Sequence, residues 1–241
     1  MPNASLTIDG TEVISKENGI INIKNTHNLT ANVLTNSHSR MVGFVTLQIF
    51  ETVGTTTWTK PVGVNFIKVY VTGGGGGGGS HNSDDAQGGG GAGGTAIKWI
   101  DVREITSVSV TVGVGGTRSI GNSSSGGGPG GVSSFGSYCS ATGGEEPETW
   151  AVGGYGGVAT GGDINLFGNA GICGNIDGGG NEESSGVGGA SYWGGTGRGG
   201  SHWGARSNPR GWGSGGSGTH ASTDDEGTDG YKGVVIVEEY V

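Results

Sequence analysis

The side chains best suited to recognising another molecule gather between residues 190 and 223. This stretch has no Asp or Glu, although the whole chain carries a net charge of -9. Trp faces stack on sugars and other apolar surfaces, and Arg binds phosphate or carboxylate through paired hydrogen bonds. The stretch therefore predicts a contact with another molecule, with two tryptophans as anchors and two arginines as clamps. Its candidate residues are Tyr192, Trp193, His202, Trp203, Arg206, Arg210 and Trp212.

A second interpretation of the same residues is structural. Tryptophans can cover a glycine-rich chain as lids while arginines face water at its rim. Two other segments between glycine runs, 145–150 and 163–167, offer further candidates for this contact, because loops vary while a scaffold holds them. They add Trp150, Asp163 and Phe167 to the predicted site.

Catalytic and cofactor motifs are weak. Carboxylates cluster at 145–148, 224–229 and 238–239. Paired acids held about 5 to 10 Å apart can hydrolyse glycosidic bonds, but no groove-forming scaffold is visible in the sequence and surface solubility is the favoured explanation. The histidines lack the spacing of a metal site, and the GxGxxG-like strings near 154–162 lack a following helix. We therefore expect a protein that is not an enzyme and that holds neither cofactor nor metal.

Charge and cysteine content narrow the possible functions and partners of the protein further. The chain has 21 acidic against 12 basic side chains, so it has no overall field that attracts nucleic acid, although an Arg/Gly tract with aromatics could bind single strands. We expect no nucleic-acid partner. Cys139 and Cys173 are isolated in sequence and predict two thiols or one bridge. No apolar run reaches the length of a membrane span, and no secretion signal begins the chain.

Glycine dominates the composition and is unevenly placed. Only five of the 59 glycines fall in residues 1–72. The later region has too few apolar side chains to fold around a core, so it must be ordered mainly through its backbone. An extended left-handed helix with three residues per turn has no internal hydrogen bonds, and each of its backbone groups needs an outside partner. Glycine lets such helices lie close enough to bond to one another.

Short runs with alternating side chains predict strands around that region. Val69 and Val71 share one face of 65–72 while Lys68 and Tyr70 share the other. Similar alternation marks 107–114 and the closing strand 233–241. The expected fold is thus mostly irregular with minor β: a sandwich of packed polyglycine II helices over about 73–230, pinned by a small β-sheet. Residues 1–55 form a preceding β-rich attachment segment, and residues 56–241 form the glycine-rich domain.

Several motifs resemble the glycine-rich domain at the distal end of bacteriophage tail fibres. They are WTKPVGV at 58–64, FIKVYVTGGGGGGG at 66–79, SVSVTVGVGG at 107–116 and GYKGVVIV at 230–237. The resemblance covers about 56–241, and its middle part rests on composition alone. It implies a host-recognition adhesin at the fibre tip, in the virion, made in the host cytoplasm, whose variable loops contact the bacterium.

The expected function is therefore binding to a bacterial outer-membrane protein or surface glycan. The expected partners also include the tail-fibre shaft, joined through residues 1–55, and two further copies in a homotrimer. The alternative is a structural glycine-rich wall or matrix protein without a specific receptor. The interruptions between glycine runs all differ, whereas a wall protein would repeat monotonously.

Overall fold

The computed structural model describes residues 4–8, 11–17, 20–23, 43–80, 86–120, 127–148, 151–175, 184–200, 206–219 and 226–241. The chain separates into two compact units, Met1–Met41 and Val42–Val241. The first unit contains a three-stranded antiparallel sheet in the order β1-β2-β3. Its strands are β1 (Ala4–Ile8), β2 (Thr11–Glu17) and β3 (Ile20–Ile23).

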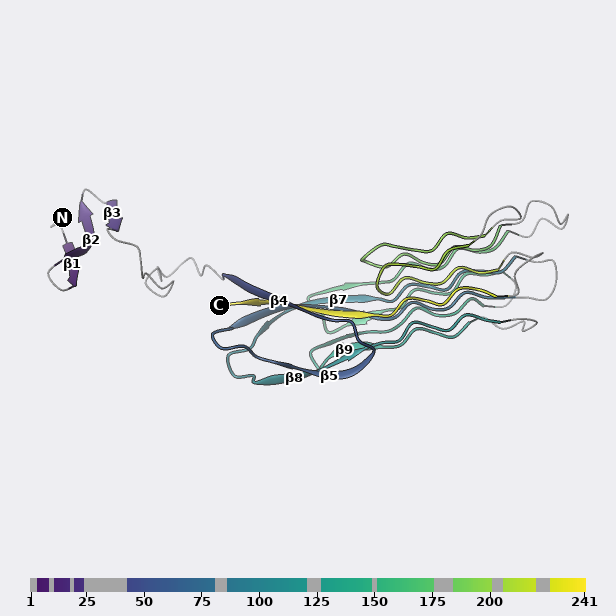
Figure 1. Cartoon of the computed structure of the whole chain (residues 1–241), viewed down its shortest axis with the longest axis horizontal. Coiled ribbons are helices and arrows are strands. Elements are labelled where there is room, and N and C mark those ends of the chain that lie inside the picture. Colours follow the sequence, from purple (N-terminus) through teal and green to yellow (C-terminus); the bar gives the residue numbers. More distant parts are fainter. Residues whose placement is uncertain are drawn as a thin grey trace. The chain divides into compact units, whose positions relative to one another are not determined.

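The second unit is built on two five-stranded antiparallel sheets (Figure 1). The first sheet has the order β12-β7-β6-β13-β4, and the second has the order β11-β10-β9-β8-β5. The first sheet comprises β4 (Phe44–Phe50), β6 (Phe66–Thr72), β7 (Thr95–Asp101), β12 (Ile164–Leu166) and β13 (Val234–Tyr240). The second comprises β5 (Gly54–Thr59), β8 (Ser107–Val112), β9 (Ser133–Phe135), β10 (Cys139–Ala141) and β11 (Ala159–Thr160).

A hydrophobic core joins the two sheets. Ile67, Val69 and Val71 alternate along β6 and are fully buried, as the period of two in that run predicts. From the second sheet, Trp58 and Phe135 are also fully buried, with ring centroids 5.8 Å apart. Strands with one buried face need a partner layer, and each sheet supplies it for the other.

The predicted boundary between residues 55 and 56 falls inside β5. Both β4 and β5 belong to the second unit, and β4 pairs along its length with β13. The attachment role expected of residues 1–55 stays a prediction, and the part of that segment in the first unit is Met1–Met41.

The glycine-rich segments between residues 73 and 233 run out from one end of the sheets and back again, side by side (Figure 1). We call these segments, without the strands, the glycine body. Close to the sheets the chain turns back through strands or through tight turns at 191–194 and 211–214, where Gly194 and Gly213 have positive φ. At the far end, the described segments are interrupted at 81–85, 121–126, 149–150, 176–183, 201–205 and 220–225.

Hydrogen bonds within the glycine body follow a period of three. Successive N–H groups of 73–79 donate in turn to three neighbouring segments, and the carbonyl groups of the same run accept from three others. The accepting segments are 88–94, 128–131 and 228–231, and the donors come from 116–119, 144 and 216–219. Hydrogen bonds between backbone groups, not side-chain contacts, therefore hold the glycine body together. Glycine is required because neighbouring segments approach each segment from several sides.

The predicted fold class is wrong. The described residues contain no helix, and their regular structure is β, in two five-stranded antiparallel sheets with a shared core. The protein is thus mostly β, not a sandwich of polyglycine II helices pinned by a small sheet. The sequence analysis recognised neither the seven-residue strand β7 nor the three-residue strand β9, and strand propensity is a weak signal when a strand's partner lies far away in sequence.

The two cysteines are free thiols in different surroundings. Cys139 lies in the core, where burial raises the pKa of its thiol to about 11, whereas Cys173 is exposed. Because the thiolate is the reactive form, a thiol reagent near neutral pH is expected to modify one cysteine rapidly in the folded protein and both after unfolding. Cys173→Ser should abolish the rapid reaction. Equal rates for both thiols in the folded protein would contradict this assignment.

Candidate functional site

The residues that flank all six interruptions meet at one end of the glycine body, which we call the loop end. Ser119 N donates to the Gly78 carbonyl and Gly227 N donates to the Ser119 carbonyl. The Ser80 and Ser119 hydroxyls lie 2.8 Å apart in a buried hydrogen bond. These bonds join the flanks of the interruptions at 81–85, 121–126 and 220–225.

The remaining flanks join the same array. Gln87 N donates to Thr219 O at 3.0 Å, and Gly186 N donates to Gln87 O at 2.7 Å. Ser185 N in turn donates to Gly200 O, and Gly174 N to Ala151 O. The flanks of the six interruptions, where the chain leaves and re-enters the described body, are thus fixed relative to one another by backbone bonds. Such an end can display six segments of unrelated sequence without changing its own structure.

An ion cluster stands at the rim of the loop end. The Arg118 guanidinium lies 3.0 Å from Glu226 and 3.5 Å from Asp229, measured between Nη2 and Oε2 and between Nη1 and Oδ2. The backbone N–H of Arg118 also donates to Asp229 Oδ1 at 2.8 Å. The cluster ties 116–120 to the returning segment 226–233. Because its contacts join two segments of the glycine body, we assign it a positioning role.

Of the ten predicted receptor-binding residues, three lie outside the described residues: Trp150, His202 and Trp203. Tyr192, Trp193 and Trp212 are brought together, but beside the sheets and away from the loop end. Trp193 contacts both of the others, with ring centroids at 4.9 Å from Tyr192 and 5.8 Å from Trp212.

These three aromatic residues make contacts within the fold. Trp193 Nε1 donates to Thr72 Oγ1 at 2.9 Å, at the point where β6 passes into the glycine body. Trp212 Nε1 donates to Glu51 Oε2 at 3.2 Å. Tyr192 packs against Tyr70 and stays half exposed. Their contacts support the structural interpretation offered above, and their role in receptor binding stays a prediction.

The other predicted residues lie apart from this cluster. Asp163 is at the edge of the first sheet, where its carboxylate accepts from Trp99 N at 2.8 Å and pairs with Lys98 at 3.7 Å. Phe167 follows β12 and is highly exposed. Arg206 is half-buried and Arg210 is exposed, both on the segment 206–211.

The sequence analysis missed an aromatic and charged array on the outer face of the first sheet. Lys68 Nζ lies 4.7 Å from the ring centroid of Tyr70 and 5.6 Å from that of Trp99. Glu238 accepts from the hydroxyls of Tyr70 and Tyr240. The alternation in 66–72 predicted this polar face, but residues 95–101 had not been recognised as a strand that would add Trp99 to it.

Two groups of this array have shifted pKa values. Hydrogen bonding to Tyr70, with a smaller effect of the Glu238 charge, raises the pKa of Lys68 despite partial burial. Burial, and then the bond to Glu238, raises the pKa of Tyr240 to about 12. At neutral pH the face therefore carries an ammonium among aromatic rings, held in place by cation–π contacts.

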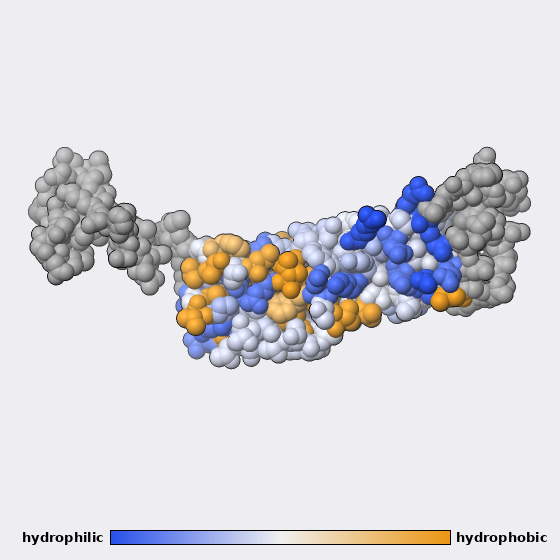
Figure 2. Space-filling view, viewed as in Figure 1, coloured by the Kyte–Doolittle hydropathy of each residue, from blue (hydrophilic) through white to orange (hydrophobic). Residues whose placement is uncertain are grey.

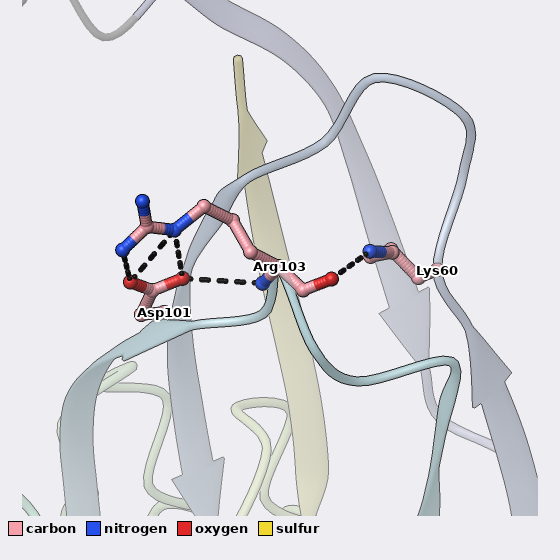
Figure 3. A network of polar contacts seen from close by, with 3 residues as sticks. All are labelled: Lys60, Asp101 and Arg103. Carbon is pink, nitrogen blue, oxygen red and sulfur yellow. Dashed lines mark hydrogen bonds and ion pairs between the residues drawn. The ribbon is translucent and has the colours of Figure 1, made fainter.

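A polar network fixes the end of the sheets away from the glycine body (Figure 3). The Arg103 guanidinium bonds to both carboxylate oxygens of Asp101 at the end of β7, and Lys60 Nζ donates to the Arg103 carbonyl at 2.9 Å. Asp101 raises the pKa of Arg103, mainly through these hydrogen bonds. All three side chains stabilise the turn that links the two sheets, and we assign them no binding role.

The family of the chain follows from its glycine-rich part. A family described as a glycine-rich domain matches residues 51–240. The chain belongs to this glycine-rich domain family. The match runs from just after β4 to the last residue of β13, so it covers the glycine body and every strand of the two sheets except β4. No curated protein matches the sequence.

Two searches of the described residues were negative. They contain no group of three or more His, Cys, Asp or Glu side chains placed to hold a metal ion. Within the same residues there is also no helix with the length and apolar character needed to cross a membrane.

Proposed function

We propose that this glycine-rich domain protein is the receptor-binding tip of a bacteriophage tail fibre, an adhesin that acts by binding. Its target would be an outer-membrane protein or a glycan on the bacterial surface. The first unit, Met1–Met41, would connect the tip to the fibre shaft. The phage assignment rests on the motifs at 58–79, 107–116 and 230–237.

The observation that carries the binding proposal is the loop end. Six sequence interruptions, all different, enter and leave the glycine body at one end of it. A scaffold fixed by backbone bonds keeps the flanks of those six interruptions in place before any partner arrives. Binding then loses less conformational entropy than binding through a mobile surface would.

The sequences of the six interruptions also suit recognition. Together they contain three of the five histidines, Trp150 and Trp203, seven acidic residues, and neither Lys nor Arg. Aromatic side chains supply the contact energy typical of hot spots. The acidic charge favours a receptor surface that is neutral or basic, and it makes the association rate depend on salt.

The proposal is tested by binding of the fluorescently labelled full chain to a panel of bacterial strains. We expect it to coat only some strains and to block phage adsorption to those strains. A Trp203→Ala, Arg206→Ala double variant should lose about thirtyfold in affinity, the cost typical of removing an aromatic anchor. Val62→Ala is the matched control, because Val62 is fully exposed at the opposite end of the second unit.

The outcomes separate the function from the site. A folded wild-type protein that binds no strain, or all strains equally, would overturn the adhesin proposal and favour the structural alternative. Selective binding that survives the double variant would leave the function standing and move the contact to 145–150 or 163–167. Thermal unfolding of each variant must match the wild type, because a tryptophan that serves as a lid would lose binding only by losing structure.

A further inference from the structure

The four outer edges of the two sheets differ in how they are protected. A sheet edge exposes unpaired N–H and C=O groups that can pair with another chain, and proteins usually shorten or charge such edges. In the second unit, β11 has two residues and β12 has three. The edge strand β5 is longer, but its exposed central residues are three threonines. The remaining edge, β4, has none of these protections.

The strand β4 is seven residues long and reads FVTLQIF, without a charged residue, Pro or Gly. Among the described residues, it pairs only with β13. Four of its apolar side chains are exposed: Phe44 at 61%, Val45 at 48%, Leu47 at 45% and Ile49 at 48%. Figure 2 shows apolar residues gathered over the end of the second unit that carries the sheets. An apolar edge of this length indicates a partner strand.

The sequence of β4 matches itself when it is read in the opposite direction. If two copies pair as antiparallel strands centred on Leu47, Leu47 lies opposite Leu47, Thr46 opposite Gln48, and Val45 opposite Ile49. Each of these pairs joins residues of similar character, and no like charges meet. Apolar and β-branched pairs directly opposite each other stabilise antiparallel sheets. The self-matching order makes a second copy of this chain the partner that fits best.

We propose that two copies of the protein associate through their β4 strands, antiparallel and about a twofold axis at Leu47, to form one ten-stranded sheet. The arrangement closes on itself, because each copy uses its β4 edge once and the edges left over are the short β12 strands. It gives a dimer in place of the trimer that the tail-fibre resemblance implies. The proposal does not depend on the receptor-binding function.

The pairing of β4 with β13 sets which side chains meet at the axis. From Thr46 to Phe50 the register with β13 is regular, and Leu47 and Ile49 lie opposite Glu238 and Ile236 on the outer face. The irregularity is confined to the end of the strand, near Tyr240. The central residues of β4 are therefore flat enough to accept a second strand, and Leu47 meets its own copy on the outer face.

The experiment measures the mass of the full chain in solution by light scattering and sedimentation. We expect twice the chain mass of 23.8 kDa. Leu47→Lys and Leu47→Glu, each alone, should give half that mass, because like charges would face each other across the axis. An equimolar mixture of the two variants should restore the dimer, because Lys then faces Glu. Val62→Lys, an exposed apolar position away from β4, is the matched control and should stay dimeric.

Three results would overturn the proposal. The wild-type chain could be a monomer at every concentration, it could have the mass of three chains, or it could stay dimeric in both charged variants. Failure of the mixed variants to associate would equally rule out pairing at Leu47. A wild-type circular dichroism spectrum and a cooperative unfolding transition show that the variants are folded, so a loss of mass reports on association alone.

Discussion

Replacement of Gly78 by Ala is expected to destabilise the protein by about 3 kcal/mol or more, the upper end of the range for overpacking. An added Cβ at Gly78 would fall on the backbone carbonyl of Ser217, far inside van der Waals distance. Neither backbone can move aside, since the Ser217 carbonyl accepts from Thr228 N at 2.9 Å, while Gly78 donates to Thr228 O at 2.9 Å and accepts from Ser119 N at 3.0 Å. Denaturant unfolding followed by tryptophan fluorescence measures the loss.

The neighbouring residue supplies the control. An added Cβ at Gly79 would meet its nearest atom, Gln87 Cβ, at 3.4 Å, which is an ordinary contact. Gly79→Ala should leave stability unchanged or raise it slightly, because alanine has less backbone freedom to lose on folding. Equal destabilisation by both changes would show that conformational preference, and not close packing, explains the glycines.

The same packing explains why recognition would be confined to the loop end. Within the glycine body a new side chain meets backbone at most positions, so sequence change there costs stability. The glycines for which this clash holds lie in the described segments, between the sheets and the flanking bonds of the loop end. A binding protein that must change its target while it keeps its fold needs such a division.

Part of the fold could be predicted from local pattern alone. The alternation of Ile67, Val69 and Val71 against Lys68 and Tyr70 fixes both the strand and its buried face, and β6 lies where that pattern predicts it. The pairing of β4 with β13 could not be predicted, because the two strands are separated by nearly the whole chain. Gln48 and Glu239, which bond across that pair, are 191 residues apart.

The candidate site shows a similar limit. Composition grouped Trp193, Trp203 and Trp212 into one surface, since they fall in one stretch of sequence. The described segments 195–200 and 206–210 run between the sheets and the loop end, and six residues span at most about 20 Å when extended. Trp193 and Trp212 are therefore beside the sheets, whereas the interruption that holds Trp203 begins and ends at the loop end. Closeness in sequence could not reveal this separation, because it does not show that the chain runs from the sheets to the loop end and back.

A second large effect is expected at Glu239, a carboxylate buried in the core between the sheets. Glu239 has no exposed surface, and its Oε1 accepts from Trp58 Nε1 at 2.8 Å and from Gln48 Nε2 at 2.7 Å. Glu239→Ala removes the acceptor of both donors and leaves a cavity. A buried donor without a partner costs about 1 to 3 kcal/mol. We therefore expect Glu239→Ala to lower the free energy of unfolding by about 3 kcal/mol or more.

The adjacent Glu238 tests whether burial causes that loss. It also accepts two side-chain hydrogen bonds, from Tyr70 and Tyr240, but on the half-buried outer face of β13. Water can replace the carboxylate there, so Glu238→Ala should cost about 1 kcal/mol or less. Trp58→Phe should share the effect of Glu239→Ala, and in a double-mutant cycle the two losses should not add. Additive losses, or equal losses at residues 238 and 239, would show that the bond from Trp58 to Glu239 does not stabilise the contact between the sheets.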